Sequence, residues 1–116
     1  MTAAPDRPER LYRIIVNERP VRADFESNEA LGQQPRRPLS GEAAVLWAGL
    51  SVFDSLATAR AQRGRSTWIG DFIAELLLPE AVQIRARRTT KTEGHWTIWA
   101  EPDLLLASVV AIIDVR

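Results

Sequence analysis

Residues 93–115 read EGHWTIWAEPDLLLASVVAIIDV, and this stretch gives the clearest indication of the fold. Its first part, residues 95–100, alternates between two faces and is rich in aromatic and β-branched side chains, which predicts a strand. Glu101-Pro102-Asp103 then opens a short helix, because proline fits the first turn and an acidic residue favours the positive end of the helix dipole. The apolar run 109–115 predicts a strand that is covered on both faces and central in its sheet.

The rest of the chain supplies the other elements of an α+β domain. Strands are predicted at residues 11–16, 50–53, 72–78 and 82–87, and helices at residues 24–31, 41–48 and 56–63. Because the helices cluster in the N-terminal half, we expect a mixed or antiparallel sheet rather than a doubly wound one. Residues 1–10 are polar and contain prolines, so we expect a flexible arm ahead of a single compact domain at residues 11–116.

Composition excludes several classes of function. The chain has 116 residues, with 15 basic and 15 acidic side chains, and this balance gives no preference for nucleic acid or an anionic membrane. No cysteine and a single histidine make a disulfide framework and a zinc site improbable. No apolar run approaches the roughly 20 residues that a membrane span needs. The first ten residues contain no signal-like apolar segment, so we expect a cytoplasmic protein.

Three side chains are candidates for a binding or catalytic site. Arg13 lies on a strand face between apolar neighbours, where a cation needs a carboxylate, a phosphate or a path to water. A simple edge position, with the guanidinium reaching solvent, is the alternative. His95 can act as a general acid or base near neutral pH, or can be a structural hydrogen-bonding residue. Trp99 shares its predicted face and can stack on an adenine or nicotinamide ring, or can simply fill the core.

Taken in order, Tyr12-Arg13, the strand Gly49-Leu50-Ser51-Val52-Phe53 and the segment Glu93-Gly94-His95 resemble the ADP-ribosyltransferase fold. The chain is also similar to short, uncharacterised bacterial proteins that share a "YRI", "SV(F/Y)" and "GH(W/Y)T(I/L)W" skeleton, across residues 11–115. The resemblance implies that Arg13 holds the phosphates of NAD and that Ser51 supports the nicotinamide ribose. It also implies that the Glu93–His95 segment stabilises the cationic ribosyl transition state.

The chain departs from that family pattern at two places. His95 stands where the family has its second glutamate, and the serine-threonine-serine triplet is reduced to Leu50-Ser51-Val52. We therefore keep two functions open: transfer of a ribosyl-phosphate group from NAD or a related nucleotide, and a non-catalytic protein-interaction module similar to an immunity protein or antitoxin. Nucleic-acid binding ranks third. The cluster of Arg85, Arg87 and Arg88 favours it, but the zero net charge of the chain argues against it.

Overall fold

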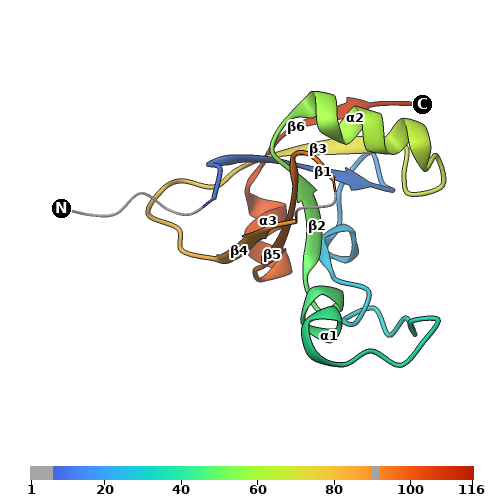
Figure 1. Ribbon diagram of the computed structural model, residues 1–116. Coiled ribbons are helices and arrows are strands. Elements are labelled where there is room, and N and C mark those ends of the chain that lie inside the picture. The colour runs from blue at the N-terminus through green and yellow to red at the C-terminus, as the bar shows by residue number, and fades with distance from the viewer. Residues whose placement is uncertain (1–6, 90–91) are drawn as a thin grey trace.

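An antiparallel sheet of six strands runs through residues 7–89 and 92–116, the part of the chain that the computed structural model describes (Figure 1). The strands are β1 (Arg10–Ile15), β2 (Leu50–Phe53), β3 (Phe72–Leu77), β4 (Arg85–Arg88), β5 (His95–Trp99) and β6 (Val109–Asp114). Their order across the sheet is β4-β5-β2-β1-β3-β6. The helical elements are the 3₁₀ turn η1 (Arg22–Phe25), α1 (Gly41–Trp47), α2 (Leu56–Arg65) and α3 (Pro102–Ala107). The predicted α+β class with an antiparallel sheet is confirmed.

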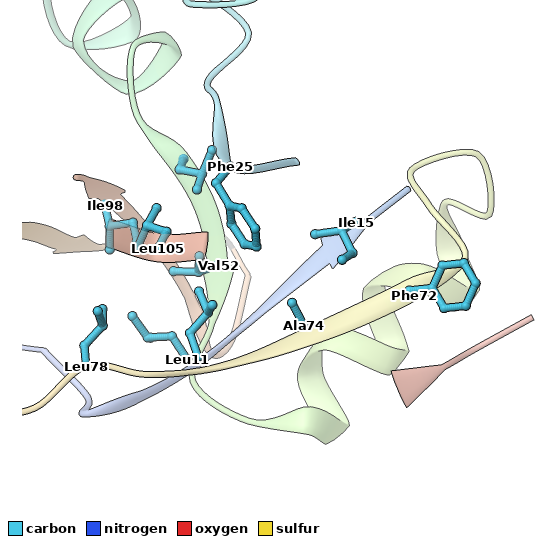
Figure 2. Packing of buried hydrophobic residues seen from close by; sticks show 11 residues of the cluster. Leu11, Ile15, Phe25, Val52, Phe72, Ala74, Leu78, Ile98 and Leu105 are labelled. Carbon is cyan, nitrogen blue, oxygen red and sulfur yellow. The ribbon is translucent and has the colours of Figure 1, made fainter. Parts of the chain in front are cut away.

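Both faces of the sheet are covered, so the core has two parts. On one face Leu11, Val52 and Ile98 pack with Phe25 of η1 and Leu105 of α3, as Figure 2 shows. The other face, under α2, carries the second cluster, which consists of Ile14, Phe53, Ala59 and Ile73. The alternation of each strand divides its side chains between these two clusters. The same alternation decides which polar side chains share a face.

The element boundaries follow the predicted ones closely, apart from two segments. The helix predicted over residues 24–31 is reduced to the single turn η1, followed by turns up to Gly32. That segment has too few apolar side chains to hold a longer helix against the sheet. The strand predicted at residues 82–87 pairs only from Arg85 to Arg88, while Val82 and Ile84 pack against the core without joining the ladder.

The prediction that the last strand is central was wrong. β6 lies at an edge of the sheet and pairs with β3 alone among the described strands. The register shifts between Glu75 and Leu76, and Val110 is left 53% exposed at this irregularity. The two middle strands of the sheet are instead β2 and β1, and β1 has β2 on one side and β3 on the other.

The start of the described chain is part of the fold. Arg7 is buried, and its guanidinium donates hydrogen bonds to the carbonyl oxygens of Leu78 at 3.2 Å and Pro79 at 3.1 Å, and to that of Val82. The predicted arm at residues 1–10 is therefore too long at its C-terminal end, and residues 1–6 lie outside the described part. Within residues 7–89 and 92–116, no helix is long and apolar enough to cross a membrane.

Candidate functional site

The candidate site lies where β1 and β2 diverge. The two strands share a single registered pair, Tyr12 with Phe53, and Figure 1 shows β2 turning steeply away from β1. Arg13 follows this pair, and its Nη1 donates to the carbonyl oxygen of Ser51 at 2.8 Å. The guanidinium therefore satisfies a β2 carbonyl that a longer β1–β2 ladder would have paired with a backbone N–H.

A buried carboxylate fixes the second contact of Arg13. Asp24 of η1 accepts hydrogen bonds from the backbone N–H of Val16 at 3.2 Å, the backbone N–H of Val21 at 2.9 Å and the side-chain amide of Asn17 at 3.1 Å. These bonds hold η1 against the end of β1. The carbonyl oxygen of Asp24 thereby accepts from Nε of Arg13 at 2.8 Å.

Arg13 supplies a cation with unused donors. Burial lowers the pKa of Arg13 to about 10, and the nearby Asp24 carboxylate opposes that shift, so the guanidinium remains charged at neutral pH. No carboxylate among the described residues forms a salt bridge with Arg13. Its two hydrogen bonds leave Nη2 without a partner among the described residues, and no buried side-chain nitrogen in that part of the chain lacks one, so Nη2 is not fully buried. The free N–H groups are therefore accessible to a ligand.

A cavity of about 690 Å³ opens beside Arg13. This volume is within the range of small-molecule sites. Arg13, Ser51 and His95 all line it, Arg13 from the sheet face of Leu11 and Ile15 and the other two from the face of Phe53. The apolar part of the lining includes Leu46, Trp47, Phe53 and Ile69, and the neutral polar part includes Gln62, Thr89, Thr92 and Thr97. None of the described lining residues is a carboxylate.

Ser51 and His95 form a hydrogen-bonded pair in this lining. Ser51 pairs with Thr97 and Phe53 pairs with His95 across β2 and β5, which places all four side chains on one face. The distance between Oγ of Ser51 and Nε2 of His95 is 2.9 Å, and the imidazole packs edge-on against the ring of Phe53. Burial lowers the pKa of His95, so the ring is neutral at pH 7 and Nε2 can accept the serine proton.

Glu93 and Trp99 do not line this cavity. Glu93 is exposed on the turn before β5, where Gly94 adopts a φ of 75°. Trp99 lines a second cavity, its Nε1 donates to the carbonyl oxygen of Val45 at 3.1 Å, and the guanidinium carbon of Arg85 lies 4.4 Å from its ring centroid. One face of the Trp99 ring is thus occupied by Arg85. The structure brings Arg13, Ser51 and His95 together and leaves Glu93 and Trp99 apart from them.

Sequence reasoning missed Trp47 and Thr97 as lining residues. Trp47 lies on an apolar stripe with Ala43, and such a stripe favours core packing over ligand contact. Thr97 was detectable, since it lies two residues after His95 and therefore on the same face of the strand. A Cβ on Gly49 would come within 2.3 Å of Cγ2 of Thr97, which shows how closely the start of β2 approaches β5.

The described residues contain no group of three histidine, aspartate or glutamate side chains arranged to hold a metal ion. Comparisons with protein-family models, with curated proteins and with solved structures find no match to this chain.

Proposed function

We propose that this protein binds a small anionic ligand of the nucleotide class, with NAD as the first compound to test, in the cavity beside Arg13. The proposal rests on one observation: a guanidinium with unused donors faces a cavity whose described lining has no carboxylate. A charged, forked donor of this kind suits the oxygens of a phosphate group. An aspartate or glutamate in the lining would have repelled the same group.

The rest of the lining suits the other parts of a nucleotide. Trp47 and Leu46 offer an apolar surface for a base or nicotinamide ring, and the Ser51–His95 pair offers polar atoms for ribose hydroxyl groups. In this arrangement Trp47, rather than Trp99, would be the aromatic contact of the ligand.

Binding is better supported than ribosyl transfer. Transfer passes through a cationic ribosyl group, which a nearby carboxylate would stabilise, and Glu93 lies outside the cavity. The ADP-ribosyltransferase-like architecture remains part of the proposal, supported by the placement of Arg13, Ser51 and His95 on β1, β2 and β5. A transferase would need a carboxylate supplied by another molecule or by a different position of residues 92–94.

Titration of the protein with NAD, AMP and inorganic phosphate, followed by tryptophan fluorescence, tests the proposal. We expect a saturable change that disappears in Arg13→Gln and persists in Arg36→Gln, which changes an exposed loop arginine away from the cavity lining. In Trp47→Phe the fluorescence change should shrink while calorimetry still detects binding. Absence of saturation at millimolar concentrations of all three compounds would contradict the proposal.

A protein-interaction module is the second candidate, because large apolar side chains are exposed at one end of the sheet. Trp68 is 81% exposed and Val16 is 64% exposed. Pairing of Ile15 with Phe72 places the segments that carry these two side chains next to each other. Exposed apolar surface of this kind favours contact with a globular protein, such as the partner of an immunity protein or antitoxin.

Co-purification from the native host separates the two candidates. The module would retain a protein partner through size-exclusion chromatography without added nucleotide, and Trp68→Ser would release that partner. The ligand-binding function, by contrast, should be unaffected by Trp68→Ser, because Trp68 does not line the Arg13 cavity.

A further inference from the structure

The Ser51–His95 pair has the geometry of a nucleophile and its base. Oγ of Ser51 lies 2.9 Å from Nε2 of His95, inside the roughly 2.6–3.2 Å over which a base can accept the proton of an attacking hydroxyl. Ser51 is exposed at the cavity, and the imidazole makes a T-shaped contact with the ring of Phe53, with 5.4 Å between the ring centroids. A neutral His95 is in the protonation state that this role requires.

A positive charge stands next to the same serine. Nη1 of Arg13 donates to the backbone carbonyl oxygen of Ser51, and the guanidinium and the serine hydroxyl both line the same cavity. A guanidinium at this place can hold the anionic group of an ester whose acyl carbon lies at the Ser51 hydroxyl. Thr97, which pairs with Ser51 across the strands, also lines the cavity, and its hydroxyl lies 3.4 Å from that of Thr89.

We propose that Ser51 is a nucleophile that His95 activates, and that the cavity hydrolyses carboxylic esters which carry a phosphate or carboxylate group. The inference rests on the proposed function, because Arg13 holds the anionic group of the ester. Neutral polar and apolar side chains form the rest of the described lining, which suits a small acyl group. The substrate class is therefore an anionic ester of limited size.

The reaction needs only the ester and water. Oγ of Ser51 bonds to the acyl carbon while Nε2 of His95 takes the hydroxyl proton. The bond from the acyl carbon to the alcohol oxygen then breaks, and His95 returns the proton to that oxygen. Water attacks the acyl-serine with His95 again as the base, the acid is released, and the Ser51 hydroxyl is restored.

A fluorophosphonate probe, which bonds to activated serines with loss of fluoride, tests the inference directly. We expect one equivalent of label on the intact protein, mapped to Ser51 by peptide mass spectrometry and absent in Ser51→Ala. His95→Gln should slow labelling by about 100-fold or more. Ser40→Ala is the matched control, because Ser40 is exposed but makes no side-chain cap bond, and its loss should leave the labelling rate unchanged.

The pH profile adds a readout that a purely structural hydrogen bond would not change. Labelling should be constant near neutral pH and should fall in acid, as His95 becomes protonated. Labelling of wild-type Ser51 no faster than that of Ser40, or an unchanged rate in a folded His95→Gln variant, would overturn the inference. Peptide mapping of the wild-type protein gives this answer even if a variant fails to fold.

Phosphate binding to Ser51→Ala distinguishes failure of this inference from failure of the proposed function. If the variant binds phosphate in an Arg13-dependent way while wild-type Ser51 stays unlabelled, ligand binding stands and the nucleophile is refuted. If Ser51 is labelled rapidly while no anion binds, the nucleophile stands, and both the anion-binding function and the anionic substrate class fall.

Discussion

The sequence predicts which face of the strand Arg13 occupies, but it does not predict its hydrogen-bond partners. Alternation along β1 predicts that Arg13 shares a face with Leu11 and Ile15, and a cation there was expected to need partners. Among the described residues, its guanidinium donates to the carbonyl oxygens of Asp24 and Ser51. Backbone carbonyls have no sequence signature, so these contacts could not be predicted, whereas the residue itself could.

Substitution of Arg13 should lower stability as well as ligand binding. Arg13→Gln loses two hydrogen bonds from a charged donor, and we expect a loss of about 1.5–3 kcal/mol in the free energy of unfolding. Urea denaturation followed by circular dichroism measures this loss. The control Arg36→Gln should stay within about 0.5 kcal/mol of wild type. Equal stability of Arg13→Gln and Arg36→Gln would mean that the two bonds do not contribute.

His95 should make stability depend on pH. Burial lowers the pKa of His95 in the folded protein below its usual 6.5, so the unfolded chain binds the proton more readily. The free energy of unfolding should therefore fall as pH drops from about 6.5 toward the folded-state pKa, and level off below it. Urea denaturation of wild type and His95→Gln at several pH values isolates this contribution as the difference in slope. Parallel curves for the two proteins would contradict it.

At the scale of elements, η1 is a single turn that the hydrogen bonds of one carboxylate fix against the end of β1. The helix predicted over residues 24–31 is reduced to a single turn. The carboxylate of Asp24 accepts hydrogen bonds from Val16, Asn17 and Val21, so it does not cap a helix that follows it. The sequence indicates a capping aspartate at this position. It does not indicate that the donors lie before Asp24 in the chain.

Removal of this carboxylate should destabilise the protein much more than removal of an exposed one. Asp24→Ala leaves the N–H groups of Val16 and Val21 without their acceptor, and we expect a loss of about 2–4 kcal/mol. Asp103→Ala removes an exposed ion pair with Arg22 and should cost less than about 1 kcal/mol. Thermal and urea unfolding of both variants compare them directly. Similar losses in the two would show that the Asp24 hydrogen bonds do not stabilise the fold.

Alanine substitutions at two glycines should change the stability of the protein in opposite directions. A Cβ on Gly70 would lie 2.2 Å from the backbone oxygen of Ile15, so Gly70→Ala should force the β3 entry away from β1 and cost several kcal/mol, roughly 2–4. Gly64 lies inside α2 with nothing within 4 Å, so Gly64→Ala should stabilise by up to about 1 kcal/mol. Melting temperatures of the two variants should move in opposite directions. A shift in the same direction would contradict the packing described at Gly70.

At the scale of the whole molecule, the sequence predicted the succession of elements better than their arrangement. Apolar periodicity and turn residues locate nearly every strand, because these signals are local. The position of a strand in the sheet depends on which distant segments pair, and the run at residues 109–115 is equally apolar at an edge or in the centre. The cavity is a further consequence of that arrangement, since Arg13, Ser51 and His95 meet only because β2 lies between β1 and β5.

Arg7 joins the start of the described chain to the segment between β3 and β4. Its guanidinium is buried against the carbonyl oxygens of Leu78, Pro79 and Val82, so Arg7→Gln should cost about 2–4 kcal/mol. Arg10→Gln removes an exposed pair with Glu75 and should cost less than about 1 kcal/mol. Urea denaturation distinguishes the two variants. If Arg7→Gln is as stable as Arg10→Gln, the hydrogen bonds of Arg7 do not contribute to the free energy of unfolding.

The two outer strands of the sheet differ in a way that limits how copies of the molecule can join. β4 presents Arg85, Arg87 and Arg88, whose charges discourage a neighbouring strand, whereas β6 offers an apolar run with a charge only at Asp114. A further strand can therefore pair with the sheet at the β6 edge but is disfavoured at the β4 edge. Two molecules that met along β6 would form a closed pair, because a filament needs both sides of every subunit.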